Sequence, residues 1–154
     1  MRAFSARWAR RSPSRGLAAL ADIARLGGPA QPYHLGFLLG PRINAGGRIG
    51  DAGLGARLLA SDDAAECEQI AVELDRLNRE RQAIETVMLQ EACAEADAEI
   101  GAGPGPAVIV TGSGKWHPGV VGLIAARLKD RFSRPAVAIA FQPNGTGMGS
   151  GRSI

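Results

Sequence analysis

The clearest pattern in the chain is an apolar stripe along residues 61–100, a stretch without glycine or proline. Its apolar positions recur three and four residues apart, which predicts one long helix buried along one side. The members of the stripe are Cys67, Ile70, Leu74, Leu77, Arg81, Ile84 and Met88. Ser61-Asp62-Asp63 is a typical helix start, because acids suit the positive end of the helix dipole.

A helix over this stretch would form a rod of about 55–60 Å. That length predicts a connecting helix between two domains rather than an element inside a small one. A free coiled coil is the alternative, because the stripe resembles a heptad repeat. Arg81 within the stripe, and the alanines toward its end, weigh against the coiled coil.

Shorter helices separated by glycine and proline are predicted before the long one. Phe4 and Trp8 are four residues apart, so they would share one face of a short helix within residues 2–12. Apolar spacing predicts a second helix over residues 16–26 and a third over residues 52–60. Serine–proline and glycine–proline breaks end the first two of these helices.

The pattern changes after the linker of glycines and prolines at residues 101–106. Short apolar runs rich in β-branched residues predict buried strands on either side of an amphipathic helix. The expected elements are a strand at 107–111, a helix at 120–132 with Pro118 in its first turn, a strand at 136–141, a turn at 143–145 and an irregular strand at 146–154. Strand, helix and strand form a βαβ unit, so we expect the first two strands to be parallel.

A glycine-rich stretch runs from Gly40 to Asp51 and reads GPRINAGGRIGD. Glycine lets the backbone approach a ligand closely, and the planar guanidinium of arginine suits phosphate oxygens. Arg42, Asn44 and Arg48 therefore indicate a polar loop that holds an anion. The alternative is an ordinary glycine-rich turn that leads into a helix.

Two further stretches resemble the first in composition. The chain ends in NGTGMGSGRSI, which contributes Ser150, Arg152 and Ser153 as candidate anion ligands. KWHPGVVG, at residues 115–122, contributes His117 at a helix start. His117 is interpreted either as a phosphate or base contact or as a residue that hydrogen-bonds its own loop. Trp116 either stacks on a base or lies buried beside a strand.

Charge is distributed unevenly, although the formal net charge is only +3. Residues 1–25 carry six Arg against one Asp, and residues 101–154 carry six Lys or Arg against one Asp. Residues 61–100 carry twelve acids against three Arg, which we interpret as a solvated helix face. Basic regions on either side of an acidic spacer would attract a polyanion, and salt would weaken that attraction.

Cysteine and histidine are too sparse to indicate a metal site. Cys67 and Cys93 have no paired motif and are expected to be small helix residues. His34 has no second ligand at suitable spacing, so a helix-start or packing role is expected for it. No run of about 18 apolar residues indicates a membrane span, and no secretory signal is evident. We expect a cytoplasmic protein without a membrane partner.

The order of these motifs resembles RecJ, a family of single-stranded-DNA-specific exonucleases in the DHH phosphoesterase superfamily. The similarity rests on GPRINAGGRIGDA, LLASDD, LDRLNRERQ, WHPGVVGLIAARL and GSGRSI, and it covers nearly the whole chain. It implies an α/β fold, with the helical tail of a DHH domain at 1–60, a connecting helix at 61–100 and the βαβ start of a DHHA1 domain at 101–154. The chain departs from the family in lacking Asp-His-His and the Asp-x-Asp of the metal site, so we expect an internal segment.

The resemblance implies a metal-dependent parent enzyme that degrades single-stranded DNA from its 5′ end, in recombination and repair, with Mn²⁺ or Mg²⁺. We expect no catalytic residue and no bound metal in this segment, and no activity from it alone. The implied substrate-binding residues are Arg42, Asn44, Arg48, His117, Ser150, Arg152 and Ser153. The alternatives are a non-catalytic nucleic-acid- or phosphate-binding module and a phosphodiesterase acting on cyclic dinucleotides or short oligonucleotides.

Overall fold

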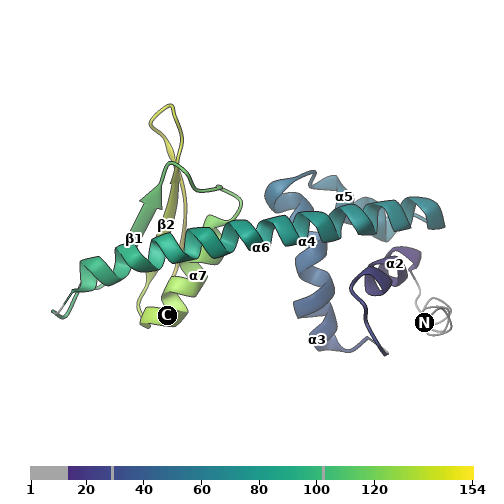
Figure 1. Cartoon of the computed structure of the whole chain (residues 1–154), viewed down its shortest axis with the longest axis horizontal. Helices are drawn as coiled ribbons and strands as arrows, with labels where there is room; N and C mark the ends of the chain where they lie inside the picture. The colour runs from purple at the N-terminus through teal and green to yellow at the C-terminus, as the bar shows by residue number, and fades with distance from the viewer. Residues whose placement is uncertain (1–13, 29, 102) are drawn as a thin grey trace. The chain divides into compact units, whose positions relative to one another are not determined.

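The structure, a computed structural model, describes residues 14–28, 30–101 and 103–154 (Figure 1). The fold is mixed α/β, as predicted, and it divides into two compact units, Met1–Arg81 and Gln82–Ile154. The boundary falls inside the long helix α6 (Ala64–Ile100), so each unit contains one part of that helix. The helix expected within residues 2–12 lies outside the described residues.

The first unit is helical and packs around one apolar core. Its helices before α6 are α2 (Arg15–Ile23), α3 (Pro32–His34), η1 (Leu35–Leu39), α4 (Gly40–Ile49) and α5 (Gly53–Ala60). Leu20, Leu39, Leu58 and Leu74 are fully buried in this core. A Cβ on Gly16 would lie 1.8 Å from the carbonyl oxygen of Leu58, so α2 packs against α5 through its glycine. The helices predicted at 16–26 and 52–60 are thus confirmed, with small shifts at their ends.

The expectation of a polar loop at Gly40–Asp51 is wrong, because α4 occupies residues 40–49. Gly46 and Gly50 of this stretch allow close packing instead of unusual backbone angles: a Cβ on Gly50 would lie 2.9 Å from Cδ1 of Leu77, and one on Gly46 would lie 3.4 Å from Cδ2 of Leu74. Among the described glycines, a positive φ occurs at Gly101, Gly105 and Gly145, all outside this stretch.

Proline within the motif widens the helix rather than ending it. Pro41 has no N–H, and its ring would clash with the carbonyl of Phe37 in a regular α-helix. The backbone instead forms the π-helical turn η1, in which the N–H of Gly40 donates to the carbonyl oxygen of Leu35. A Cβ at position 40 would lie 2.7 Å from that same oxygen, so the turn requires glycine there.

Helix α6 has 37 residues, a length of about 55 Å. Its start is as predicted, since Oδ1 of Asp63 accepts hydrogen bonds from the N–H groups of Ala65 and Glu66. The predicted stripe is buried within the chain, except that Ile84 is half-buried, so the helix is not a free coiled coil. It ends at Gly101, which has φ +53°.

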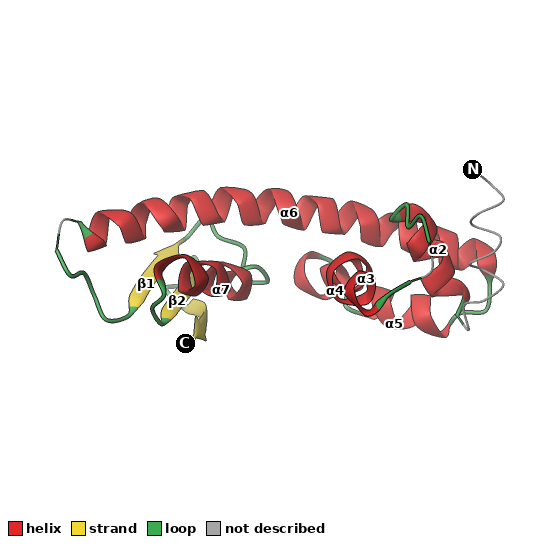
Figure 2. Cartoon of the chain, turned by 90° about the horizontal axis from the view of Figure 1, so that it is seen from below, coloured by secondary structure: helices red, strands yellow, loops and turns green. Residues whose placement is uncertain are grey.

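The second unit is a three-stranded sheet covered by α7 (Val121–Phe132). The strands are β1 (Ile109–Ser113), β2 (Ala136–Phe141) and β3 (Gly147–Arg152), in the order β1-β2-β3. β1 and β2 are parallel, as predicted, and β3 is antiparallel to β2. Figure 2 labels the first two strands and α7. The apolar face of α7 is buried through Val121, Ile124, Ala125 and Leu128. The predicted βαβ unit is therefore confirmed.

Pro118 lies outside α7 rather than in its first turn. The N–H of Val120 donates to the carbonyl of His117 at 3.0 Å, which closes a separate turn before the helix begins at Val121.

The acids on the second half of α6 are mostly exposed, as the solvated face predicted, but several of them also have partners in the second unit. Carboxylates there bind groups of the second unit: Glu85 pairs with Arg127, Glu91 accepts from Trp116, Glu95 accepts from Gly112 N–H, and Asp97 pairs with Arg131. Over the described part of the chain, no helix is long and apolar enough to cross a membrane.

Candidate nucleic-acid interface

Arg42, a predicted site residue of the first unit, is held by two hydrogen bonds. Its Nε donates to Oδ1 of Asp75 at 2.8 Å, and its Nη1 donates to the carbonyl oxygen of Leu38 at 2.6 Å. The side chain is 16% exposed. Arg42 on α4 is thus fixed by α6 and by the π-helical turn, while part of it still reaches the surface.

The structure does not bring Arg42, Asn44 and Arg48 to one place. Asn44 and Arg48 are four residues apart on α4 and share one face of that helix, whereas Arg42 lies on another face. Asn44 is exposed and Arg48 is half-buried. A single anion loop built from all three side chains is therefore not what this segment forms.

Ser150 and Arg152 are brought together by β3 in the second unit. They are two residues apart and so lie on the same face of the strand. Nη1 of Arg152 donates to Oγ of Ser150 at 2.8 Å and to the carbonyl oxygen of Gly151 at 2.7 Å. Ser153 lies just beyond the end of β3 and is exposed.

The start of α7 lies beside this serine–arginine pair. A Cβ on Gly122 would lie 3.3 Å from Nη2 of Arg152 and 3.3 Å from Oγ of Ser150. The first backbone N–H groups of a helix point out of its N-terminus and favour anions. A guanidinium, a hydroxyl and a helix N-terminus therefore lie close together beside Gly122.

His117 belongs to the loop that leads into α7. Its Nδ1 accepts a hydrogen bond from the N–H of Gly119 at 3.1 Å. An Nδ1 that accepts implies that the neutral ring carries its proton on Nε2, which is then a donor. The structure thus confirms that His117 hydrogen-bonds its own loop, and the ring retains one donor for another partner.

Trp116 and His34 have structural contacts. Trp116 is only 4% exposed, and its Nε1 donates to Glu91 at 2.8 Å, so the buried interpretation is confirmed over base stacking. Nδ1 of His34 accepts from the N–H of Gln31 at 3.1 Å, which confirms the helix-start role at α3. Cys67 and Cys93 are buried free thiols.

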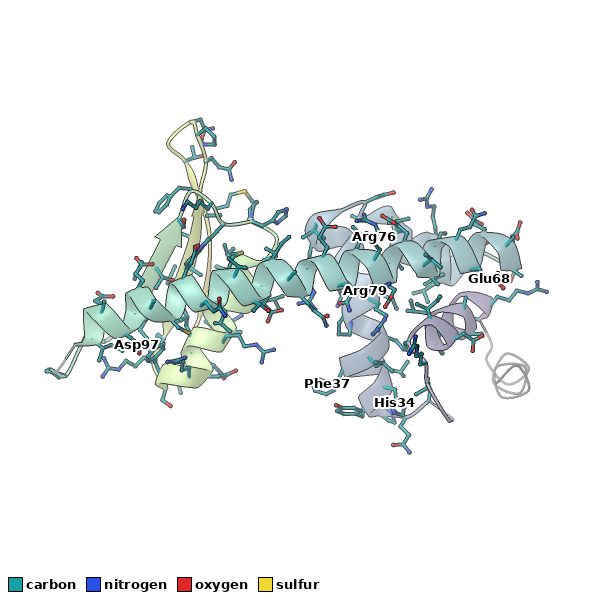
Figure 3. The ribbon with its side chains drawn as sticks, in the orientation of Figure 1. His34, Phe37, Glu68, Arg76, Arg79 and Asp97 are labelled. Atoms are coloured by element: carbon teal, nitrogen blue, oxygen red, sulfur yellow. The ribbon has the colours of Figure 1, made fainter. Side chains whose placement is uncertain are left out.

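Sequence reasoning missed Asp75 and an exposed aromatic pair. Asp75 is one of ten acids on α6, and its adjacency to the apolar Leu74 was the only sequence signal that set it apart. Tyr33 and Phe37 stack with their ring centroids 4.9 Å apart, and Phe37 is 73% exposed (Figure 3). Their spacing of four residues on a helix would have predicted the contact.

A separate pocket lies between α2 and α6 in the first unit. It has a volume of about 560 Å³ and is lined by Arg15, Asp22, Cys67 and Glu68 among others. Burial, with the nearby charge of Glu68, raises the pKa of Asp22 above its ordinary value. On the exposed side of α6, the hydrogen bond from Arg76 lowers the pKa of Glu73.

Metal ligands do not gather in the part of the chain that the structure describes. No three His, Cys, Asp or Glu side chains lie close enough there to hold a metal ion. Several of the acids on α6 are already bound by arginines, at Asp75, Glu73, Glu85 and Asp97. This set of donors does not fit the oxygen-rich cluster that Mn²⁺ or Mg²⁺ requires.

Comparisons with known proteins agree with the resemblance seen in the motifs. No family model matches the chain. The single-stranded-DNA-specific exonuclease RecJ of Salmonella typhimurium is 45% identical over 123 residues, which cover 78% of this chain and 21% of that protein. RecJ of Escherichia coli is 42% identical over 143 residues, covering 90% of this chain and 24% of that protein.

Solved structures give the same result. The crystal structure of RecJ from Thermus thermophilus in complex with Mn²⁺ has a TM-score of 0.78 and 36% identity, covering 97% of this chain and 21% of that one. The Mg²⁺ complex of the same protein also has a TM-score of 0.78.

The long helix followed by a small α/β unit is therefore a fold shared with exonucleases specific for single-stranded DNA. The chain is similar, over most of its length, to a segment of RecJ proteins. It spans about a fifth of the length of the curated relatives that it matches.

Proposed function

We propose that this chain supplies substrate-binding elements of a 5′-to-3′ exonuclease acting on single-stranded DNA. Phosphodiester hydrolysis, and the binding of the Mn²⁺ or Mg²⁺ ions that it needs, are assigned to residues that this chain does not contain. We also propose a cytoplasmic location, as for an enzyme of DNA recombination and repair. The division into a DHH part at 1–60, a connector at 61–100 and a DHHA1 part at 101–154 remains a proposal as well.

One observation carries the proposal: Ser150 and Arg152 lie against the N-terminus of α7 at Gly122. A phosphate bound at the surface of this group would meet a guanidinium, a hydroxyl and helix N–H groups, all of which can donate hydrogen bonds. The Nε2 proton of His117 adds a donor at the loop before α7. Such a set suits one phosphate of a DNA strand, and a terminal 5′ phosphate best, because that group carries more charge.

The first unit is proposed to add separate contacts to the DNA backbone. Arg42 presents a fixed guanidinium, while Asn44 and Arg48 present their side chains from another face of α4. Contacts to phosphates set affinity and position without reading sequence. Binding should therefore tolerate any base sequence and should fall with salt.

The test is fluorescence anisotropy of a labelled single-stranded oligonucleotide, with and without a 5′ phosphate, across a salt series. Arg42→Ala and Arg152→Ala are compared with Arg57→Ala and Arg131→Ala, which remove the same charge from exposed positions in the same two units. Each site variant should lower the slope of log affinity against log salt concentration by about one. Arg152→Ala should also remove the preference for a 5′ phosphate. Equal losses in site and control variants would contradict the assignment.

A non-catalytic phosphate-binding module is the second candidate, because the donor set around Gly122 needs no metal to bind an anion. Hydrolysis of 5′-labelled single-stranded DNA with added Mn²⁺ distinguishes the two. The longer RecJ-type protein carrying this segment should release nucleotides from the 5′ end, and a binding module should release none.

A further inference from the structure

The guanidinium of Arg42 is held from two sides by groups that come from different elements. Asp75 on α6 accepts from its Nε, and the carbonyl oxygen of Leu38 in η1 accepts from its Nη1. These contacts engage two of the three guanidinium nitrogens. We propose that Asp75 is a positioning residue that aims Nη2 of Arg42 at a backbone phosphate of single-stranded DNA. This inference rests on the proposed function.

Asp75 is suited to this role because its own orientation is fixed. The residue is 7% exposed, and each carboxylate oxygen has an arginine partner. Oδ1 accepts from Arg42 at 2.8 Å, and Oδ2 accepts from Nη2 of Arg79 at 2.7 Å. Arg79 is four residues further along the exposed side of α6, where Figure 3 labels it. A buried carboxylate with both oxygens satisfied has little freedom to move.

The π-helical turn supplies the second contact. Pro41 cannot donate to the backbone, and the N–H of Gly40 reaches back to Leu35. The turn places the Leu38 carbonyl oxygen 2.6 Å from the Arg42 side chain. π-helical turns inside α-helices often occur at functional sites. Gly40 thus leaves room for the turn, and Pro41 causes its widening. Arg42 is the residue proposed to contact the phosphate.

Arginine is required at position 42 by this geometry. A planar fork can donate to Asp75, to Leu38 and to a phosphate at the same time, whereas a lysine ammonium has no such fixed plane. A guanidinium fixed before binding loses less side-chain entropy when it meets the phosphate. Asp75 is therefore expected to raise affinity for DNA although it carries a negative charge.

The direction in which DNA affinity changes when Asp75 is replaced makes the inference testable. Removing an acid from a DNA-binding surface ordinarily strengthens binding, because less charge opposes the phosphates. Loss of a positioning residue weakens binding instead. Asp75→Asn should lower the affinity for single-stranded DNA roughly tenfold. Glu73→Gln, which removes the same charge two residues away on α6, should leave affinity unchanged or slightly raised.

The experiment measures anisotropy with a 5′-phosphorylated oligodeoxythymidine for the full chain and its Asp75→Asn, Glu73→Gln, Arg42→Ala and doubly substituted Arg42→Ala/Asp75→Asn variants. Because Asp75 acts through Arg42, the double variant should bind no more weakly than Arg42→Ala alone. A merely structural role would give additive losses. Thermal unfolding of each variant measures the stability effect separately.

Asp75→Glu decides the matter if Asp75→Asn does not fold. It keeps the charge but moves the carboxylate by one methylene, so the positioning role predicts weaker binding in a folded protein. Wild-type affinity in Asp75→Glu, or tighter binding by Asp75→Asn, would overturn the inference. If Arg152→Ala loses binding while the Asp75 variants do not, the proposed function stands without it. If the wild-type chain binds no DNA, both fall.

Discussion

The two candidate arginines are held in opposite ways. Arg42 is mostly buried and is fixed by a carboxylate from a distant part of the chain, Asp75, and by a carbonyl freed in a π-helical turn. Arg152 is exposed and contacts Ser150 and Gly151 of its own strand. The first arrangement depends on tertiary packing and the second on local strand geometry. In the proposed function, the same residue type would bind phosphate through two different kinds of support.

The largest expected effect is a loss of stability in the first unit that leaves the second unit folded. Gly16→Val places side-chain atoms into the backbone of Leu58, where a Cβ alone would lie 1.8 Å from the carbonyl oxygen. We expect a loss of about 3 kcal/mol or more in the stability of the first unit. Hydrogen exchange measured by mass spectrometry should show lost protection in α2, α4 and α5, with β1, β2 and β3 still protected. Loss of protection in all three strands would contradict independent support of the two sites.

Lysine substitutions should distinguish directional from purely electrostatic contacts. Arg42→Lys retains the charge but loses the planar fork, so we expect roughly tenfold weaker DNA binding. Arg152→Lys should cost only about two- to threefold, because the exposed site can accept a point charge. Anisotropy titrations at one salt concentration measure both. Equal losses would show that the two arginines work alike.

Gly122→Ala tests the space beside Arg152. Alanine favours a helix over glycine by about 0.5–1 kcal/mol, so thermal stability should be unchanged or raised. The new methyl group would lie 3.3 Å from both Ser150 Oγ and Arg152 Nη2, in the space assigned to a phosphate. We expect affinity for 5′-phosphorylated DNA to fall about fivefold. Full affinity in this variant would place the phosphate elsewhere.

The smallest expected effect concerns Asp22, which lines the pocket between α2 and α6 in the first unit. The pKa of Asp22 is raised by burial and by Glu68, so the ionised carboxylate opposes folding above that pKa. Asp22→Asn should therefore raise the melting temperature slightly at pH 7. The gain should disappear as the pH falls toward the ordinary aspartate pKa. Thermal unfolding from pH 3.5 to 7 measures it, and a gain that grows toward low pH would contradict this sign.

Much of the fold could be predicted from the sequence because local patterns determine it. The apolar stripe correctly predicted α6, and the β-branched runs around an amphipathic helix correctly predicted β1, α7 and β2. The stretch Gly40–Asp51 could not be predicted correctly, because its glycines serve packing between helices that are adjacent only in the folded chain. Composition alone does not distinguish a glycine that allows close packing from one that allows a loop.

The candidate site was predictable in its residue types but not in its contacts. The motifs identified Arg42 and Arg152, and β3 does place Ser150 beside Arg152. The partnership of Arg42 with Asp75 spans 33 positions, and no local pattern indicates it. The partners of the acids on the second half of α6 were not predicted either, because they lie 17 to 42 positions further along the chain, on β1, on α7 and in the loop between them.

The most direct test of the central claim is an NMR titration of the ¹⁵N-labelled chain with a short 5′-phosphorylated single-stranded oligonucleotide. If a phosphate binds beside Gly122, backbone amides at the start of α7 and along Ser150–Arg152 should shift first and most, and added salt should reverse the shifts. Amides in the turn at Asn144-Gly145 should not move. Shifts confined to other surfaces, with α7 and β3 unaffected in a folded sample, would contradict the account.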